Sequence, residues 1–466
     1  MLPGHLRPIL LLGAGSFFYM AFVPYYILVL LYLIVLDYTL ARYIEKTEGP
    51  KRRIYFLVSI ISTIATLGIF KYFNFFNENL TALAHALHWN YSLETLAIAL
   101  PLGLSFHTFQ SLAYVIEVYK KHYPAERSFS TYALYVMYFP QLVAGPIERP
   151  AHLLPQLKTV QIFDAARALA GLRRMTWGFF KKVVIGDHLG ILVDFVFAHS
   201  ATADASTLLV GVVAFSIQLY ADFSGYCDIA LGASQMLGID LTENFRQPYF
   251  SRSIAEFWRR WHISLSSWFR DYLYIPLGGS HVGIAQWCVN ILIVFAVSGL
   301  WHGAGWHFIA MGVVFGLYIC LGRLTAPLRD AIANTLHIRG EGRATVQIIL
   351  TFLLTTSAWI FFRAQTLQQS IEILTRIVTT WSGNAFQFLR CSDYCSFYYL
   401  GIGRKDVLLL GISILVLFIV EYFIEKNITF RAWSYRSVRW LMYWTLVMWI
   451  LLNGYFIPHT FIYFQF

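Results

Sequence analysis

An uncharged stretch of the chain has two histidines close together near its middle. Residues 272–322 lack Asp, Glu, Lys and Arg, and His302 and His307 lie near their middle, in Trp301-His-Gly-Ala-Gly-Trp-His307. An ionisable group in so apolar a segment is a functional hypothesis by default. The ordinary pKa of an imidazole is near neutral, which suits a general base or a proton relay. The alternative is a hairpin turn with His302 at the water interface, and we expect His307 to be structural.

A second candidate cluster comes shortly before. A capping-box pattern at Ser253 opens an expected amphipathic helix over residues 254–274, with aromatic side chains on one face and arginines opposite. Such a helix is expected to lie in the membrane plane as an anchor. Alternatively, Arg259 and Arg260 bind a negatively charged ligand, because guanidinium groups match phosphates. His262 lies at the edge of the apolar face.

Other chemistries lack support in the sequence. There is no His-x-x-x-His or Cys-x-x-Cys pattern and no Gly-x-Ser-x-Gly elbow, so we predict no metal site and no serine nucleophile. Cys391 and Cys395 lie close together in a polar connector, where a disulfide is possible but not indicated. The net charge of +10 is spread over short basic clusters between apolar runs, which argues against nucleic-acid binding.

The elements that position these residues are membrane helices. Hydrophobic residues make up 58% of the 466 and charged residues 13%, against about 25% charged in a soluble domain. The lipid bilayer must therefore be part of the solvent. We predict an all-α polytopic membrane protein with 10 to 13 transmembrane or re-entrant helices in one domain, residues 1–466. The apolar runs are 9–23, 25–41, 54–73, 96–119, 132–143, 183–197, 208–220, 227–237, 287–300, 306–321, 348–362, 407–424 and 440–456.

Lysine and arginine predict the orientation. Basic connectors, expected on the cytoplasmic side, are 46–53, 120–127, 173–182, 246–270 and 431–439. The connectors 74–94 and 199–206 contain no Lys or Arg and are expected outside.

Long motifs carry a family resemblance. They are Tyr138-Phe-Pro-Gln-Leu-Val-Ala-Gly-Pro-Ile-Glu-Arg-Pro150, Asp222-Phe-Ser-Gly-Tyr226 with Asp228, Asn244-Phe-Arg-Gln-Pro-Tyr249, Phe257-Trp-Arg-Arg-Trp-His-Ile-Ser-Leu-Ser266, Phe269-Arg-Asp-Tyr-Leu-Tyr-Ile-Pro-Leu-Gly-Gly279, Ser298-Gly-Leu-Trp-His-Gly303 and Phe461-Ile-Tyr-Phe-Gln-Phe466. From about residue 98 to the end, the chain resembles bacterial membrane-bound O-acyltransferases, the MBOAT family. The nearest branch is the alginate and peptidoglycan O-acetyltransferases, whose members begin with further apolar residues, so we expect this chain to start late relative to them.

The resemblance implies a site and a reaction. It makes His302 the essential histidine and His262 the second polar residue, beside a tunnel through the membrane. The implied reaction moves an acyl group, expected to be acetyl, from a cytoplasmic thioester such as acetyl-CoA to a polysaccharide hydroxyl or a periplasmic partner, with no bound cofactor. Arg259, Arg260 and Asn244 are the expected donor-binding residues, and His262, Asn244 and backbone N–H groups beside Gly303 are candidates to stabilise the oxyanion.

Two rival functions remain open at this point. One is D-alanyl transfer to teichoic acid, and the other is a transporter with a proton-relay histidine, which the lack of a visible internal repeat disfavours. The expected location is the bacterial inner membrane.

The predicted topology can be tested with single cysteines in a cysteine-free background. We expect Pro50→Cys to resist an impermeant maleimide in intact cells and His85→Cys to react, because only the first connector is basic. Labelling at position 50 without labelling at position 85 would reverse the assignment.

Overall fold

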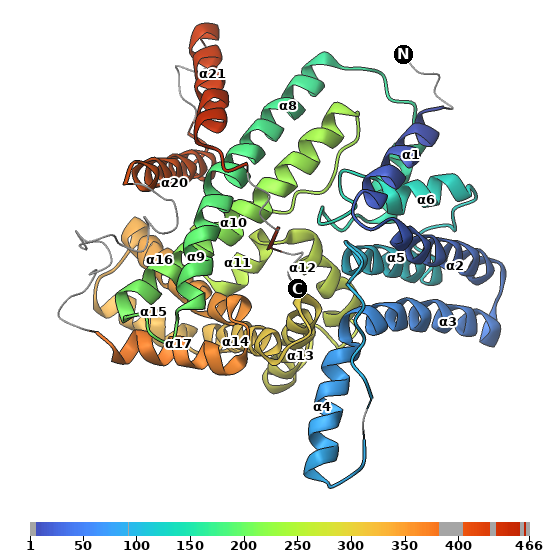
Figure 1. Cartoon of the computed structure of the whole chain (residues 1–466), viewed down its shortest axis with the longest axis horizontal. Coiled ribbons are helices and arrows are strands. Elements are labelled where there is room, and N and C mark those ends of the chain that lie inside the picture. The colour runs from blue at the N-terminus through green and yellow to red at the C-terminus, as the bar shows by residue number, and fades with distance from the viewer. Residues whose placement is uncertain (1–5, 92, 382–403, 429–434, 457–460, 463–466) are drawn as a thin grey trace. The chain divides into compact units, whose positions relative to one another are not determined.

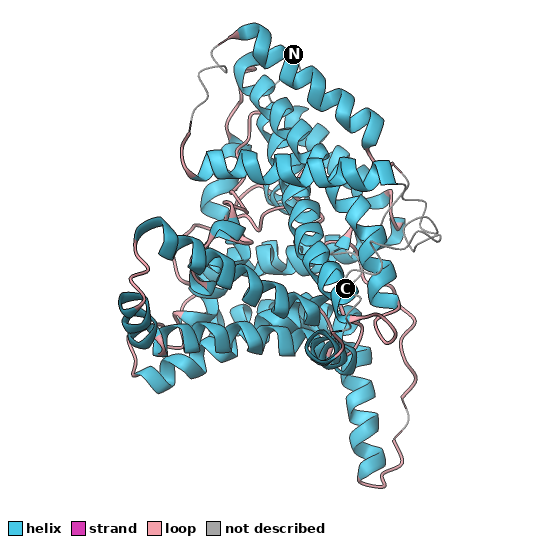
Figure 2. Cartoon of the chain, turned by 90° about the vertical axis from the view of Figure 1, so that its left-hand side faces the viewer, coloured by secondary structure: helices cyan, strands magenta, loops and turns pink. Residues whose placement is uncertain are grey.

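The predicted all-α architecture is confirmed. In the computed structural model, residues 6–91, 93–381, 404–428, 435–456 and 461–462 are described, and these contain helices, turns and loops but no strands (Figures 1 and 2). Cys391 and Cys395 lie outside the described residues, as does the end of the last motif. The chain divides into two compact units, residues 1–175 with 230–243 and residues 176–229 with 244–466. The prediction of one domain is therefore not tested by the fold alone.

The first unit contains the N-terminal helices. They are α1 (Leu6–Met20), η1 (Pro24–Tyr26), α2 (Ile27–Lys46), α3 (Gly49–Leu67), the π-helical η2 (Gly68–Tyr72), α4 (Phe73–Ala86), α5 (Leu104–Tyr119), α6 (Phe129–Met137), α7 (Pro150–Lys158) and most of α8 (Ala165–Phe179). Within this unit, α2, α3 and α5 pack on one another, and α1 packs on α6 (Figure 1).

The second unit contains the predicted site. Its elements are the π-helical η3 (Phe180–Gly186), α9 (Asp187–Ala198), most of α10 (Ala205–Met236), η4 (Pro248–Phe250), α11 (Ile254–Arg260), α12 (Ile263–Phe269), the π-helical η5 (Arg270–Tyr274), α13 (Ile284–His302), α14 (Trp306–Leu324), α15 (Ala326–Thr335), α16 (Gly340–Arg363), α17 (Leu367–Thr379), α20 (Arg404–Glu425) and α21 (Arg436–Asn453).

Seven helical segments in the described part of the chain are long and apolar enough to cross a membrane. They are Pro24–Lys46, Gly49–Ala86, Ala205–Met236, Ile284–His302, Trp306–Leu324, Gly340–Arg363 and Lys405–Glu425. The predicted 10 to 13 also counted shorter, tilted and re-entrant segments. Several of those are short helices here: α6, for example, ends at Met137, shortly before Pro140.

Two predicted boundaries are wrong because charged or polar residues do not interrupt the helices. The runs 208–220 and 227–237 belong to one helix of 32 residues, α10. The run 54–73 does not end in a connector, because helix continues through η2 and α4 to Ala86. Residues 74–86 contain no Gly or Pro to break it.

The basic segment 173–182 is not a connector either. It lies inside the continuous helical segment formed by α8, η3 and α9. Lys181 is buried, and its ammonium pairs with Asp228 on α10 (2.5 Å). Arg174 forms a bidentate pair with Glu243, at 2.6 Å for both hydrogen bonds. Part of the charge that suggested a cytoplasmic loop is therefore neutralised within the fold.

Helices α13 and α14 form a hairpin that presents His302. They are joined by Gly303-Ala304-Gly305 and lie side by side (Figure 1). Gly299 and Gly312 allow this close approach: a Cβ at Gly299 would lie 2.2 Å from the carbonyl oxygen of Phe308, and one at Gly312 would lie 2.0 Å from that of Phe295. The glycines thus fix where the last residue of α13 lies.

The hairpin predicts different effects for two identical substitutions on α14. Gly312→Ala should lower the free energy of unfolding of the purified protein by about 1–3 kcal/mol, because the methyl group of the new alanine overlaps the Phe295 carbonyl. Gly322→Ala has open space around it and should be neutral or slightly stabilising, since alanine favours helix. Equal melting temperatures in detergent for both variants would contradict the close packing.

Candidate active site

A short backbone pairing breaks the expected helix at the second histidine. Residues Phe245 and Trp261 form an antiparallel bridge, and Ile263 N–H donates to the Asn244 carbonyl oxygen (3.0 Å). His262 adopts a left-handed backbone conformation with φ 44° and ψ 54°. The predicted continuous helix over residues 254–274 is therefore wrong: it is divided into α11, α12 and η5. The capping box at its start is confirmed, because the Ser253 hydroxyl accepts from the N–H of Glu256.

The aromatic face of this segment belongs to the protein core. Phe257 and Trp261 are fully buried, and the ring of Trp261 lies 5.4 Å from that of Phe257 and 5.3 Å from that of Trp359 on α16. Phe315 of α14 packs against Phe257 as well. The apolar face that was expected to contact lipid therefore packs against α14 and α16. This packing stabilises the position of His262.

His262 is completely buried and has specific neighbours. Its ring lies 4.8 Å from that of Phe223 on α10 and 6.1 Å from that of Trp301 on α13, centroid to centroid. Its Nδ1 lies 3.3 Å from Oδ1 of Asn244. Burial lowers the pKa of His262 well below its usual range, and the nearby His302 lowers it further. His262 is therefore neutral at physiological pH.

His302 is the last residue of α13 and is only 4% exposed. Its ring contacts those of Trp301 (5.0 Å) and of Phe362 on α16 (5.5 Å). Trp301 therefore contacts both histidines predicted to be catalytic. The hairpin-turn alternative is correct about the local backbone, but the imidazole is buried among aromatic rings.

The other predicted site residues have different surroundings. Asn244 is buried and faces His262, whereas Arg259 is exposed on α11. Arg260 is held by two carboxylates, Glu256 at 2.7 Å and Glu425 of α20 at 2.6 Å. His307 is half-buried on α14 and packs against Phe308. Of the two arginines, Arg260 is held in ion pairs within the fold, and Arg259 has none of these ion pairs.

Sequence reasoning missed a buried charge network. Lys182 forms ion pairs with Asp187 (2.6 Å) and Asp222 (2.5 Å). Lys181 forms an ion pair with Asp228 and donates a hydrogen bond to the Ser224 hydroxyl (3.0 Å). The sequence signal was the presence of two carboxylates, Asp222 and Asp228, in an otherwise apolar segment, where a buried charge needs a partner. Nothing in the sequence indicated that the lysines of the basic cluster were their partners.

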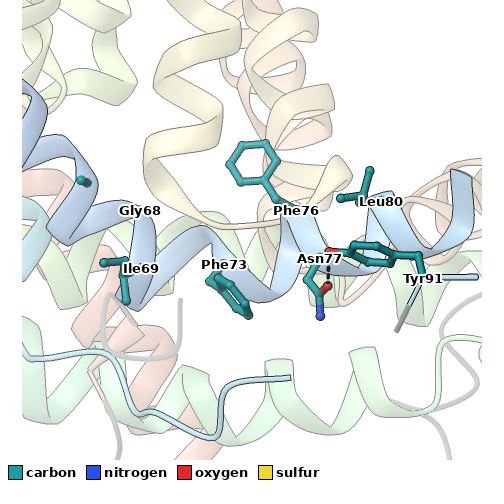
Figure 3. A pocket seen from close by; sticks show the side chains of 8 residues that line it. Gly68, Ile69, Phe73, Phe76, Asn77, Leu80 and Tyr91 are labelled. Carbon is teal, nitrogen blue, oxygen red and sulfur yellow. Dashed lines mark hydrogen bonds between the residues drawn. The ribbon is translucent and has the colours of Figure 1, made fainter. Parts of the chain in front are cut away.

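The first unit contains a groove of about 300 Å³. Figure 3 shows its lining, from Gly68 and Ile69 of η2 to Phe73, Phe76, Asn77 and Leu80 of α4, with Tyr91 donating a hydrogen bond to Asn77 (3.0 Å). The lining is apolar apart from these two polar side chains and contains none of the predicted site residues. Within the described parts of the chain, no group of three or more His, Cys, Asp or Glu residues has an arrangement that would hold a metal ion.

Comparison with known proteins identifies the class. The model of the membrane-bound O-acyltransferase (MBOAT) family matches residues 125–365. The matched range includes His262, His302, Asn244 and both candidate arginines. The chain belongs to the MBOAT family, a family of acyltransferases, and is a multi-pass membrane protein; the predicted family and enzyme class are confirmed.

Three relatives illustrate the range of substrates in this family. The peptidoglycan O-acetyltransferase of Helicobacter pylori is 35% identical over 396 residues, 78% of this chain and 72% of the relative. The probable alginate O-acetylase of Pseudomonas aeruginosa is 41% identical over 275 residues, 58% of this chain and 50% of the relative. The teichoic acid D-alanyltransferase of Bacillus subtilis is 30% identical over 233 residues, 47% of this chain and 56% of the relative. The matches to the alginate relatives thus cover about half the length of those proteins.

Proposed function

We propose that this acyltransferase moves an acetyl group from a cytoplasmic thioester, such as acetyl-CoA, across the bacterial inner membrane to a hydroxyl of a cell-envelope or exported polysaccharide. The observation that supports this most directly is a pair of buried histidines, His262 and His302. Both contact the ring of Trp301, although they come from different segments of the chain. Both belong to the region that matches the acyltransferase family model.

In the proposed reaction, His302 is the general base. It takes the proton of the acceptor hydroxyl as that oxygen attacks the thioester carbonyl, and it returns the proton to the departing thiolate when the C–S bond breaks. A proton transfer of this kind accelerates a reaction by about 10²- to 10⁴-fold. The aromatic rings of Trp301 and Phe362 around His302 exclude water and so favour transfer to the acceptor over hydrolysis.

The donor end of the reaction involves Arg259 rather than Arg260. Arg260 would have to give up its two carboxylate partners to bind a phosphate. Arg259 is exposed on the same helix, one residue away, and carries the charge that a phosphorylated donor requires. We therefore assign donor binding to Arg259 and a structural role to Arg260. The side chain of Asn244 faces His262, Ser264 and Cys227, which favours a role in the reacting centre over one in donor binding.

The acceptor is proposed from the relatives. Two of the three relatives above are named for O-acetylation of a polysaccharide, and the matches to these two are longer than the match to the D-alanyltransferase. Transfer to the polysaccharide takes place directly or through a periplasmic acyltransferase partner. D-alanyl transfer to teichoic acid is the second candidate within the family, and family membership argues against a transporter whose histidine relays protons.

The assignment of the two arginines predicts a separation of their effects. Arg259→Gln should raise the donor KM about tenfold, equivalent to about 1.4 kcal/mol, without changing the melting temperature. Arg260→Gln should instead lower stability by on the order of 1 kcal/mol, because the carboxylates of Glu256 and Glu425 lose their partner. Arg252→Gln removes another exposed charge and serves as the control for net charge. An unchanged KM for Arg259→Gln would remove its donor role.

The general-base assignment predicts the outcome for two matched histidine variants. His302→Gln keeps the approximate size and polarity of the side chain but removes the base, so acetyl transfer from labelled acetyl-CoA in membranes should fall about 10²- to 10⁴-fold while donor binding persists. His307→Gln, on the other side of the Gly303-Ala304-Gly305 turn, should keep most of its activity. Protein amount and monodispersity are measured for each variant. Turnover close to wild type by His302→Gln would be incompatible with the proposed base.

A further inference from the structure

The side chain of Asn244 is fixed by its neighbours in one orientation. Asn244 is 1% exposed, and its Oδ1 lies 3.1 Å from the backbone nitrogen of Ser264, 2.9 Å from the Ser264 hydroxyl and 3.3 Å from Nδ1 of His262. On the other side of the amide, Nδ2 lies 3.5 Å from Sγ of Cys227. A backbone N–H can only donate, so the atom of Asn244 that faces Ser264 N must be the acceptor oxygen. The opposite amide orientation would place two donors against each other.

The orientation of this amide determines the hydrogen position on His262. A neutral imidazole has one N–H donor and one nitrogen with a lone pair. Nδ1 of His262 faces the amide oxygen, an acceptor, so a lone pair on Nδ1 would be repelled and a hydrogen there is stabilised. The backbone pairing between residues 244–245 and 261–263 holds the two side chains together, because the Ile263 N–H bonds to the Asn244 carbonyl.

We propose that Asn244 is a positioning residue that holds His262 in the tautomer with hydrogen on Nδ1, and so makes Nε2 of His262 a hydrogen-bond acceptor. Its role in catalysis rests on the proposed acyl transfer, but the tautomer itself does not. The assignment removes neutral His262 from the candidates for oxyanion stabilisation, because Nε2 then has no hydrogen to donate. Asn244 stays a candidate, because its NH₂ group has a second N–H beside the one directed at Cys227.

A lone pair on His262 favours the proton transfer at His302. His302 becomes a cation when it takes the hydroxyl proton, and both histidines have Trp301 as a neighbour. The lone-pair side of a neutral imidazole is the negative end of its dipole, and it stabilises a cation that lies on that side of the ring. A hydrogen on Nε2 would have the opposite effect. The oxyanion is then left to backbone N–H groups and to other donors, among them the second N–H of the Asn244 amide.

The tautomer can be measured without any activity. Full-length protein labelled with ¹⁵N-histidine in nanodiscs is compared with the His262→Gln variant, which assigns the His262 signals. We expect a protonated Nδ1 and an unprotonated Nε2 at neutral pH. A hydrogen on Nε2 in the unmodified protein would overturn the proposal whether or not the enzyme transfers acetyl groups, and a protonated Nδ1 in an inactive preparation would leave the proposal intact and count against the proposed function alone.

Three variants connect the tautomer to turnover. Asn244→Leu removes the acceptor at similar size and should yield mixed tautomers and a kcat lower by on the order of 10- to 100-fold, with the donor KM unchanged. Asn244→Asp keeps the acceptor, so it should retain the Nδ1–H tautomer and most of the activity. Its negative charge raises the pKa of His262, so the acidic limb of the pH–rate profile should move to higher pH. Cys227→Ala removes the hydrogen-bond partner of the amide nitrogen and should leave tautomer and kcat unchanged. Unchanged kcat and tautomer in Asn244→Leu would refute the positioning role.

Discussion

Pairing of buried charge is the constraint on which the second unit depends. An isolated charge in an apolar interior costs several kcal/mol, and removing one partner of a buried pair leaves that cost uncompensated. Asp222 and Asp228 lie in the middle of a helix of 32 residues, α10, which is possible because Lys182 and Lys181 of η3 meet them. Asp222 also accepts the backbone N–H of Ile462, so the same carboxylate holds the C-terminal segment. One network therefore links η3, α10 and the end of the chain.

This network explains which parts of the fold the sequence could predict. The charge-poor runs of α13, α14 and α20 predicted their helices closely, because length and hydropathy are sufficient where few polar groups interrupt. Hydropathy separates the runs 208–220 and 227–237 around Asp222, and the basic residues of 173–182 make that segment look like a connector. Each half of the network, seen alone, resembles a break in a membrane helix. Only the pairing across space shows that neither is one, and hydropathy along a single segment contains no such information.

The candidate site shows the same limit at the level of the backbone. The aromatic spacing of residues 254–274 fits a helix, and α11 and α12 are indeed helical on both sides of His262. The break comes from the pairing of Phe245 with Trp261, two residues from separate motifs, and from a left-handed conformation that histidine tolerates better than most residues. His302 could be proposed from its position in an uncharged stretch, and His262 from its position at the edge of an aromatic face. The hydrogen-bond partner of His262 could not be inferred. Asn244 lies eighteen residues earlier in the chain, and the sequence gives no sign that its amide faces His262 rather than the acyl donor.

The two histidines also differ in the contacts that fix their positions, and this difference matches the different roles proposed for them. His302 ends a helix whose position is fixed by glycine contacts with α14, and its ring packs against those of Trp301 and Phe362. His262 is held by a backbone bridge and a polar side chain that define its hydrogen-bonding state. A proton acceptor must change its charge during each turnover, and an aromatic setting tolerates both states because ring faces also attract cations. A residue that supports the acceptor works best when its own protonation never changes. The polar, fully buried setting of His262 and the apolar setting of His302 are therefore those expected of a fixed supporting group and a titrating base, respectively.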